Sequence, residues 1–522
     1  MAGFDGILTP YTRRKNPSNL RIFPILTIAT SMILLFSVFL HYSVPRPTEI
    51  GSNLWKSKYS NLYHGCSKPT PEFSNAPHTT RPQRFLVIAT TGGLDRQRFA
   101  IVDAVAVARI LNATLVVPKL DHKSFWNDSS NFSDIYDVDW FISSLSKDVK
   151  ILKELPPRKG EVVSPYQTHV PRKCTPACYQ KRVLPLFKKK QVVQLSKFES
   201  RLANELDSDL QKLRCRVNYH ALRFTKPILN MGRQLVKRMR ARSTHFIALH
   251  LRFETNVLAF SGCYYGGGEK QNKELDAIRK RWKTLHTGNP DRARRQGRCL
   301  LTPEEVGLTL RALGFERDTH IYMASGEVYG GEESLSRLRA IFPLLDSKNT
   351  LSREDELSPF SSFALRMGAV DFVVCDESDV LVTNNNGNTA KILAGRRRYF
   401  GHKPTIRPNA KILSSLFMNR PNMTWEAFAS EVRTHQRGYM GEAMEVRPGR
   451  GEFVENPAVC ICETREGQLS IEKPEPVEDQ LVEDDTEVDY VGPQDKELAN
   501  SLDYNLFLRD EEQPSIENML SD

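Results

Sequence analysis

The stretch RFLVIATTGGLDRQRFAIVDAVAVARILNATLVVP, residues 84–118, decides the fold class. Its apolar runs at 84–90 and 114–118 are typical of buried strands, and residues 100–113 carry apolar side chains at helical spacing. A strand, a glycine turn, a helix and a second strand in this order predict an α/β fold with a parallel sheet.

A second series of the same kind follows. HFIALHLR (245–252) predicts a strand, residues 302–315 a helix with a capping-type start, and HIYMAS (320–325) another strand. Residues 362–401 predict a helix, two strands, a glycine-rich turn and a closing helix. Two such series predict two Rossmann-like domains with a central cleft, and ligands of such sheets bind beyond the carboxyl ends of the strands.

The charge of the chain is unevenly distributed. The formal net charge of the 522 residues is +11. Residues 463–522 hold 19 acidic and 4 basic side chains, a net charge of −15, so the rest of the chain carries +26. We expect this acidic tail to be disordered. The basic remainder suits an anionic ligand or polymer, such as a nucleotide sugar, pectin or nucleic acid, although an ordinary basic surface is the plain alternative.

The N-terminal region predicts the compartment. Residues 22–44 contain no Asp, Glu, Lys or Arg and are long enough to span a bilayer core of about 30 Å. Basic side chains precede them, so residues 1–21 should form a cytosolic tail. A signal anchor is favoured over a cleaved signal peptide because the apolar run is long and no clear cleavage site follows it. Residues 45–82, rich in Pro, Ser, Thr and Asn, would then be a stem, and the remainder would be lumenal.

Sequons and cysteines fit a lumenal chain. N-glycosylation acceptors are predicted at Asn112, Asn127, Asn131 and Asn422. All nine cysteines follow the apolar segment, where disulfides are expected, but their connectivity cannot be deduced. A zinc site is disfavoured because paired CxxC units are missing from the sequence.

Arg252 is the first candidate for binding and catalysis. It stands at the end of a predicted strand, two residues after His250 on the same strand face. A guanidinium can meet two phosphate oxygens and can stabilise a departing diphosphate without a metal. The alternatives are an ion pair between Arg252 and Glu254, or a carboxylate of the other domain, and a structural role for His250.

The turn TTGGLDRQR (90–98) is the second candidate. Gly92 and Gly93 allow the backbone to approach a substrate closely, and Asp95 could accept a hydrogen bond or a proton. The alternative is an ordinary tight turn before a helix, capped by the aspartate.

The turn TNNNGNTA (383–390) is the third candidate. It follows a strand and opens a helix, so that Asn386, Gly387 and Asn388 could hold an anion or a ribose, although such clusters are usually plain turns. The basic run 396–398 follows on the same helix, and a solvated helix face is its favoured interpretation.

Two acidic pairs are candidate metal ligands. The pairs Asp137-Val-Asp139 and Asp207-Ser-Asp209 have the DxD spacing of metal-dependent glycosyl transferases, but such pairs are common by chance. A P-loop, a nucleophile elbow and HExxH do not occur in the sequence. We therefore expect no metal and no cofactor, and the lumenal topology argues against a nucleic-acid partner.

Four long motifs carry a family resemblance. They are DAVAVARILNATLVVPKLDHKSFWNDSSNFSDIYDVDWFI, HLRFETNVLAFSGCYYGGG, VCDESDVLVTNNNGNTAKILAGRRRYFGHK and EVRPGRGEF. Together they resemble the plant O-fucosyltransferase-like family of glycosyltransferases, from about Phe85 to Cys462. The resemblance implies a GT-B fold, with an N-terminal Rossmann-like domain at 83–240 and a nucleotide-sugar-binding one at 241–462.

The resemblance also implies an activity and site residues. The activity would be metal-independent, inverting transfer from a nucleotide sugar, classically GDP-fucose. His250, Leu251 and Arg252 would contact the donor, with Arg252 on the diphosphate. Asn386, Gly387 and Asn388 would form part of the nucleotide pocket.

One loop departs from the family pattern. The family usually has NGGLNQ where this chain has TGGLDRQ, which leaves the catalytic base open. The resulting prediction is a single-pass type II Golgi membrane protein that moves fucose from GDP-fucose to a glycan or protein hydroxyl. The alternatives are a rhamnosyl- or mannosyl-type transferase of cell-wall polysaccharide, and an inactive scaffold that binds the nucleotide sugar.

Overall fold

The computed structural model describes most of the chain after residue 53. The described residues are 54–57, 60–122, 128–157, 163–266, 269–281, 289–384, 387–436, 453–454 and 457–464. They belong to one compact unit, Ile50–Asp522. The predictions for residues 1–44, for Asn127 and Asn386, and for nearly all of the acidic tail lie outside them. Within the described part of the chain, no helix is long and apolar enough to cross a membrane.

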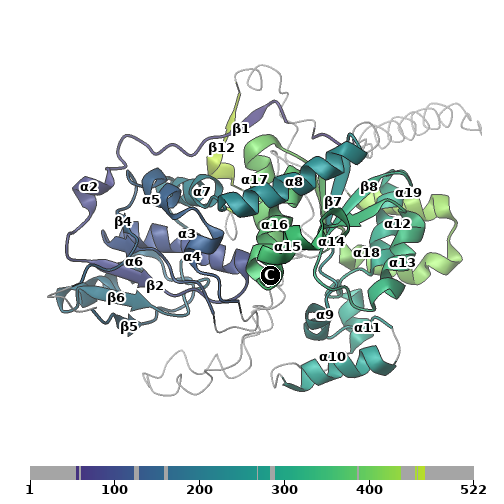
Figure 1. Cartoon of the computed structure of the whole chain (residues 1–522), viewed down its shortest axis with the longest axis horizontal. Coiled ribbons are helices and arrows are strands. Elements are labelled where there is room, and N and C mark those ends of the chain that lie inside the picture. Colours follow the sequence, from purple (N-terminus) through teal and green to yellow (C-terminus); the bar gives the residue numbers. More distant parts are fainter. Residues whose placement is uncertain are drawn as a thin grey trace, which may run out of the picture. The chain divides into compact units, whose positions relative to one another are not determined.

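The N-terminal half contains a sheet of five parallel strands (Figure 1). Their spatial order is β4-β3-β2-β6-β5, with β2 at Phe85–Ile88, β3 at Thr114–Val116, β4 at Ile151–Leu152, β5 at Tyr166–Thr168 and β6 at Val192–Leu195. The predicted parallel sheet is therefore confirmed. Helix α3, Leu94–Ile110, joins β2 to β3 and begins inside the glycine turn. From Ala100 to Ala108 every residue of α3 is buried, which explains why this helix is apolar on nearly every side.

The C-terminal half contains a second sheet of five parallel strands. Their spatial order is β11-β10-β7-β8-β9, with β7 at Phe246–His250, β8 at His320–Ala324, β9 at Leu345–Ser347, β10 at Val380–Thr383 and β11 at Thr405–Ile406. In chain order this is the 3-2-1-4-5 arrangement of a doubly wound sheet, and the direction of winding reverses between β7 and β10. In the N-terminal sheet the reversal falls between β2 and β6.

Helices cover the sheets and fill the connections. The segment 302–315 is a helix as predicted, with a capping box between Thr302 and Glu305 and a left-handed Gly314 after its end. Besides α3, the helices in the described part of the chain are α2 Ala76–Thr79, α4 Phe132–Ile135, α5 Val138–Ser144, α6 Pro176–Arg182, η2 Leu184–Lys188, α7 Ser208–Cys215, η3 Arg216–Ala221, α8 Lys226–Arg242, α9 Thr255–Ser261, α10 Glu269–Arg281, α11 Pro290–Arg295, α12 Pro303–Leu313, α13 Gly331–Ile341, α14 Lys348–Leu351, α15 Glu354–Ser361, α16 Ala364–Glu377, α17 Asn388–Gly401, α18 Ala410–Asn419, η4 Arg420–Asn422, α19 Trp425–His435 and η5 Ala458–Cys460.

One predicted strand is wrong. The apolar run that begins at Val370 belongs to α16, which is a single helix of 14 residues. Figure 1 shows α16 between the two sheets. Its side chains join a hydrophobic core that contains Leu86 of β2 and Phe246 of β7. A helix that is buried on most sides needs apolar residues on most sides, so its sequence resembles a buried strand.

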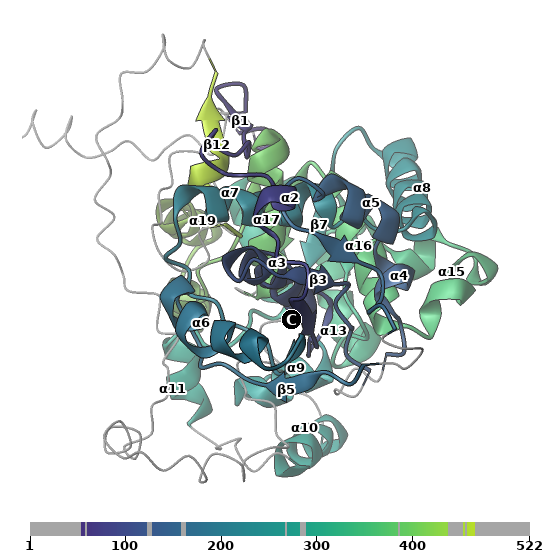
Figure 2. The same ribbon diagram turned by 90° about the vertical axis from the view of Figure 1, so that its left-hand side faces the viewer.

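The end of the predicted stem is folded. Strand β1, Tyr63–Gly65, pairs antiparallel with β12, Ile461–Glu463, and the two lie side by side in Figures 1 and 2. A disulfide between Cys66 and Cys462 closes this pair. Such a short strand has no periodicity of its own, and its partner lies almost 400 residues away in the sequence, as the separation of 396 between the two cysteines shows.

The nine cysteines form four disulfides and one free thiol. The bonded pairs are Cys66–Cys462, Cys174–Cys178, Cys215–Cys460 and Cys263–Cys299. Cys375 is free and buried in α16.

Candidate active site

Two of the predicted motifs meet where the winding of the C-terminal sheet reverses. His250 ends β7 and lies beside Thr383, the last residue of β10. HLR follows the end of β7 and TNNNGNTA begins at the end of β10, so the chain leaves the sheet at neighbouring positions after His250 and after Thr383. This is the position at which doubly wound sheets bind ligands.

Arg252 is a buried cation whose hydrogen-bonding capacity is incompletely used. It is 6% exposed, and its φ of 49° is in the left-handed region, which is unusual for a residue with a Cβ. Its Nη1 lies 3.9 Å from Glu254 Oε2, so the ion pair considered as an alternative is present. Among the described residues, however, Nε and Nη2 of Arg252 have no hydrogen-bond partner.

Other polar atoms at this point are equally unsatisfied. Nδ1 of His250 and Oγ1 of Thr383 are buried, and no described residue hydrogen-bonds to either atom. Leaving a buried donor or acceptor without a partner costs about 1–3 kcal/mol, so such atoms are rare in native proteins. Those of His250, Thr383 and Arg252 belong to the ends of two adjacent strands, where they could hydrogen-bond to a polar, anionic ligand.

Glu254 is the counter-ion of Arg252 and is fixed by the turn after β8. Its Oε1 accepts hydrogen bonds from Ser325 Oγ and from the backbone N of Gly326, each at 3.1 Å. Burial by itself would raise the pKa of Glu254, but the charge of Arg252 and the N–H of Gly326 lower that pKa overall. The carboxylate is therefore ionised, and it holds one side of the guanidinium.

His250 is a neutral imidazole. Burial, reinforced by the charges of Arg252 and Lys348, lowers the pKa of His250 to about 3. The nearby ammonium of Lys348 donates to the carbonyl of Ser325 and to Asp371 Oδ2, both at 2.7 Å. At neutral pH His250 can thus give or accept a hydrogen bond but carries no positive charge.

Leu251 and Asn384 support the site from behind. The side chain of Leu251 is fully buried in the hydrophobic core. Asn384 Nδ2 donates to the carbonyls of Leu251 at 2.9 Å and Leu301 at 2.7 Å, and its Oδ1 accepts from the backbone N of Leu301 at 3.1 Å. The sequence did not indicate this role. Asn384 holds together three segments that are distant in the sequence.

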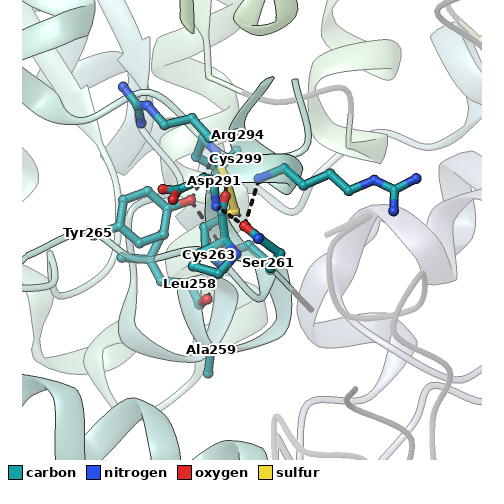
Figure 3. Close-up of a disulfide and its surroundings, with 12 residues drawn as sticks. Leu258, Ala259, Ser261, Cys263, Tyr265, Asp291, Arg294 and Cys299 are labelled. Carbon is teal, nitrogen blue, oxygen red and sulfur yellow. Dashed lines mark hydrogen bonds between the residues drawn. A yellow bond between two sulfur atoms is a disulfide. The ribbon is translucent and has the colours of Figure 1, made fainter. Parts of the chain in front are cut away.

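A disulfide braces the segment that follows Arg252 (Figure 3). Cys263 and Cys299 join the end of α9 to the residues before α12. Next to this bond, the hydroxyl of Tyr265 donates to Ser261 Oγ at 3.4 Å and accepts from the backbone N of Leu300 at 3.0 Å. The disulfide and the hydrogen bonds of Tyr265 hold in place the backbone at Leu300 and Leu301, and Asn384 hydrogen-bonds to that of Leu301.

The glycine turn TTGGLDRQR, residues 90–98, lies where the winding of the N-terminal sheet reverses, between β2 and β6. Gly92 adopts a φ of +92°, its N–H donates to Asp121 Oδ2 at 3.0 Å, and Gly93 precedes the first residue of α3. Oγ1 of Thr91 donates to Oε1 of Glu199, a buried residue just after β6. The sequence gave no signal for Glu199, because its place beside the glycine turn depends on the pairing of β2 with β6.

Asp95 joins the two halves. It is the second residue of α3 and is 5% exposed, and its Oδ2 accepts a hydrogen bond of 2.6 Å from Thr389 Oγ1. Thr389 is the second residue of α17, which Gly387 caps and Asn388 opens. The N-termini of the two helices therefore meet at a carboxylate, and helix N-termini favour negative charge.

The basic run after TNNNGNTA is not a solvated face, so that prediction is wrong. Arg397 and Arg398 are 1% and 2% exposed. The guanidinium of Arg397 donates to several backbone carbonyls, among them those of Cys375 at 2.7 Å and Pro404 at 3.1 Å. Burial lowers the pKa of Arg397 to about 10, so the side chain stays charged at neutral pH. It binds the end of α16 and the residues before β11.

Both DxD pairs have structural roles. Asp137 and Asp207 accept from the first turns of α5 and α7 as N-caps. Asp139 pairs with Lys153 at 2.6 Å, and Asp209 accepts from Thr70. Within the described residues, no cluster of three or more His, Cys, Asp or Glu side chains could hold a metal ion. Three of the predicted sequon acceptors, Asn112, Asn131 and Asn422, are exposed.

The fold and the site define an α/β protein of two doubly wound halves, with a buried arginine and two helix N-termini at the carboxyl ends of the strands. The family model described as GDP-fucose protein O-fucosyltransferase matches residues 85–400. The chain belongs to this family, in its plant O-fucosyltransferase-like branch, and is a glycosyltransferase.

Similar proteins agree with the family but differ in name. The chain is 60% identical to O-fucosyltransferase 6 of Arabidopsis thaliana over 485 residues, which cover 90% of this chain and 86% of the relative. It is 39% identical to rhamnogalacturonan I rhamnosyltransferase 1 of the same plant over 455 residues, covering 83% and 89%. A crystal structure of POFUT1 with GDP-fucose is 14% identical, with a TM-score of 0.39 over 63% of this chain and 99% of that one, too little to support a conclusion.

Proposed function

We propose that this glycosyltransferase moves fucose from GDP-fucose to a hydroxyl of a glycan or a glycoprotein, with inversion and without a metal. The observation that carries the proposal is the group of unsatisfied buried polar atoms around Arg252, at the reversal point of the C-terminal sheet. A diphosphate has the charge and the oxygen atoms to satisfy them. The nucleotide would extend toward Gly387 and Asn388 at the start of α17.

Transfer with inversion is one direct displacement. The acceptor oxygen attacks C1 of the sugar, the bond from C1 to the phosphate oxygen breaks, and its electron pair leaves with GDP. Arg252 stabilises the charge that develops on the leaving diphosphate. At about 4 Å and an effective dielectric constant near 20, this attraction is on the order of 4 kcal/mol, or roughly a thousandfold in rate. His250, being neutral, can only add a hydrogen bond.

Two carboxylates are candidates for the general base that accepts the proton of the acceptor hydroxyl, those of Asp95 and Glu199. Both lie at the glycine turn, and each has one oxygen engaged by a threonine hydroxyl. The isosteric changes Asp95→Asn and Glu199→Gln each keep that oxygen as an acceptor. The variant that removes the base should lose transfer at saturating donor while binding GDP unchanged, and the other should retain transfer.

A second candidate is rhamnosyl transfer to a cell-wall polysaccharide. It is favoured by the relatives that are named rhamnogalacturonan I rhamnosyltransferase 1, at 39% and 41% identity. We also propose that residues 22–44 anchor the chain in the Golgi membrane as a type II protein, because this mainly apolar run contains no Asp, Glu, Lys or Arg. Protease protection of the body of the chain in sealed vesicles would test this topology.

Isothermal titration of the full chain tests the donor. GDP, UDP and their sugars are titrated with and without Mn²⁺, beside an Arg252→Met variant. GDP binding that needs no metal and is lost in the variant would support fucose transfer, after which an acceptor screen follows. A preference for UDP would favour the rhamnosyl alternative. GDP binding without transfer to any acceptor would favour the inactive scaffold, and no nucleotide binding at all would overturn the proposal.

A further inference from the structure

A strongly basic surface lies on the N-terminal half, outside the donor site. The stretch PRKCTPACYQKRVLPLFKKK, residues 171–190, contains seven Lys and Arg residues and no Asp or Glu. It forms α6 and η2 beside β5 and β6 (Figure 1). All seven cations are exposed, and we call them the basic surface: Arg172, Lys173, Lys181, Arg182, Lys188, Lys189 and Lys190.

The backbone under the basic surface is firmly held. Tyr179 and Val183 are fully buried in the hydrophobic core. The disulfide Cys174–Cys178 closes the first turn of α6, and Thr175 caps that helix. The positions of the cations are thus fixed by a rigid support. The stretch 171–190 holds no acidic residue of its own, so its exposed cations suit an anionic partner.

The basic surface adjoins the glycine turn. Lys173 N donates to the carbonyl of Ser200 at 3.1 Å, and Cys174 N donates to that of Arg201 at 2.8 Å. These residues directly follow Glu199, which accepts the hydroxyl of Thr91. The surface therefore begins at the edge of the N-terminal sheet that faces the proposed chemistry, whereas Arg252 belongs to the other half.

An exposed aromatic ring completes the surface. Tyr166 on β5 is 43% exposed, and Lys190 Nζ lies 5.8 Å from the centre of its ring. An exposed tyrosine ring offers an apolar face to a sugar ring, and lysines act as point charges that suit flexible, repeated anions. The combination fits a polymer that presents both sugar faces and carboxylates.

We propose that the basic surface binds the acceptor, and that the acceptor is an acidic glycan that carries uronate carboxylates. This inference rests on the proposed function, because it assigns the acceptor of the same transfer reaction. Nucleic acid or an anionic lipid surface could supply negative charge as well. Neither explains why the surface leads to Glu199 and the glycine turn.

The test measures binding of the full chain to an oligogalacturonide and to its fully methyl-esterified, uncharged form. The triple variant Lys188→Gln, Lys189→Gln and Lys190→Gln removes three adjacent charges of the basic surface. The control, Lys226→Gln, Arg233→Gln and Lys237→Gln, removes three exposed charges from α8. GDP binding is titrated in parallel for all three proteins, so that a failure of the donor site is recognised separately.

We expect the charged oligomer to bind the wild-type chain, more weakly as salt is added, and the esterified form not to bind. The surface variant should lose about tenfold in affinity, as expected for three exposed charge contacts, while the α8 control keeps its affinity. Equal binding of both oligomers, equal losses in both variants, or no binding at all would overturn the proposal. Tighter binding to phosphatidylserine vesicles or to RNA of similar charge would overturn it as well.

Discussion

Replacing Arg252 by methionine should lower both the stability of the chain and its affinity for GDP, for two separable reasons. Arg252 Nη1 lies 3.9 Å from Glu254 Oε2, and the two side chains are 7% and 16% exposed. At this distance and an effective dielectric constant near 20, the attraction is on the order of 4 kcal/mol. The variant leaves Glu254 buried without its counter-ion, so we expect the free energy of unfolding to fall by about 3 kcal/mol. Because methionine also has a Cβ, the left-handed backbone is strained equally in both proteins.

Adding Glu254→Gln separates the two effects. The double variant carries no uncompensated charge, so it should regain most of the lost free energy of unfolding in urea titrations. Affinity for GDP should not return, because the cation is still missing. In both variants the loss should be on the order of 100-fold, which corresponds to about 3 kcal/mol.

Two results would refute this reasoning. If the double variant bound GDP as tightly as the wild-type chain, Arg252 would be only the structural partner of Glu254. If the single variant were as stable as the wild type, the ion pair would contribute nothing to the fold. Calorimetric titration and urea unfolding of the same protein samples measure both quantities.

Three further predictions concern protonation, packing and reactivity. Burial and two neighbouring cations lower the pKa of His250 to about 3, below its unfolded value near 6.5. Between pH 6.5 and 3 the unfolded chain therefore binds a proton that the folded chain does not. As the pH falls through this range, the free energy of unfolding should decrease by up to about 1.4 kcal/mol per pH unit. Urea titrations of a His250→Gln variant across the same range should lack this part of the slope. Gly395→Ala should lower the Tm by several degrees, because its Cβ would lie 1.6 Å from the carbonyl oxygen of Val454, whereas Gly401→Ala in the same helix meets nothing within 4 Å and should leave the Tm in place. Burial raises the pKa of the Cys375 thiol, so an aromatic disulfide reagent should label it only after unfolding, and labelling of the native chain would contradict the structure.

The sequence predicted the site residues at the ends of strands, but it did not predict the residues that surround them. His250 and Arg252 could be predicted because an apolar strand that ends in an arginine is recognisable from the sequence alone. Glu199 could not be predicted, because its neighbours in the sequence do not distinguish it from a glutamate on the surface. Arg397 was misjudged for a related reason: arginines on a helix are usually solvated, and only the backbone carbonyls around Arg397 explain its burial.

By itself, the sequence determined the two series of parallel strands, the capped helix at 302–315 and the turns at 90–98 and 383–390, because periodicity, capping and glycine act over a few residues. The tertiary structure alone decided that Asp95 meets Thr389, that the strand at 63–65 pairs with the chain end at 461–463, and that the run after Val370 is a helix. These outcomes depend on which distant segments pack together. Burial of apolar surface and hydrogen bonding of polar groups depend on contacts throughout the folded unit. A local stretch of sequence contains only one of the two residues in each such contact.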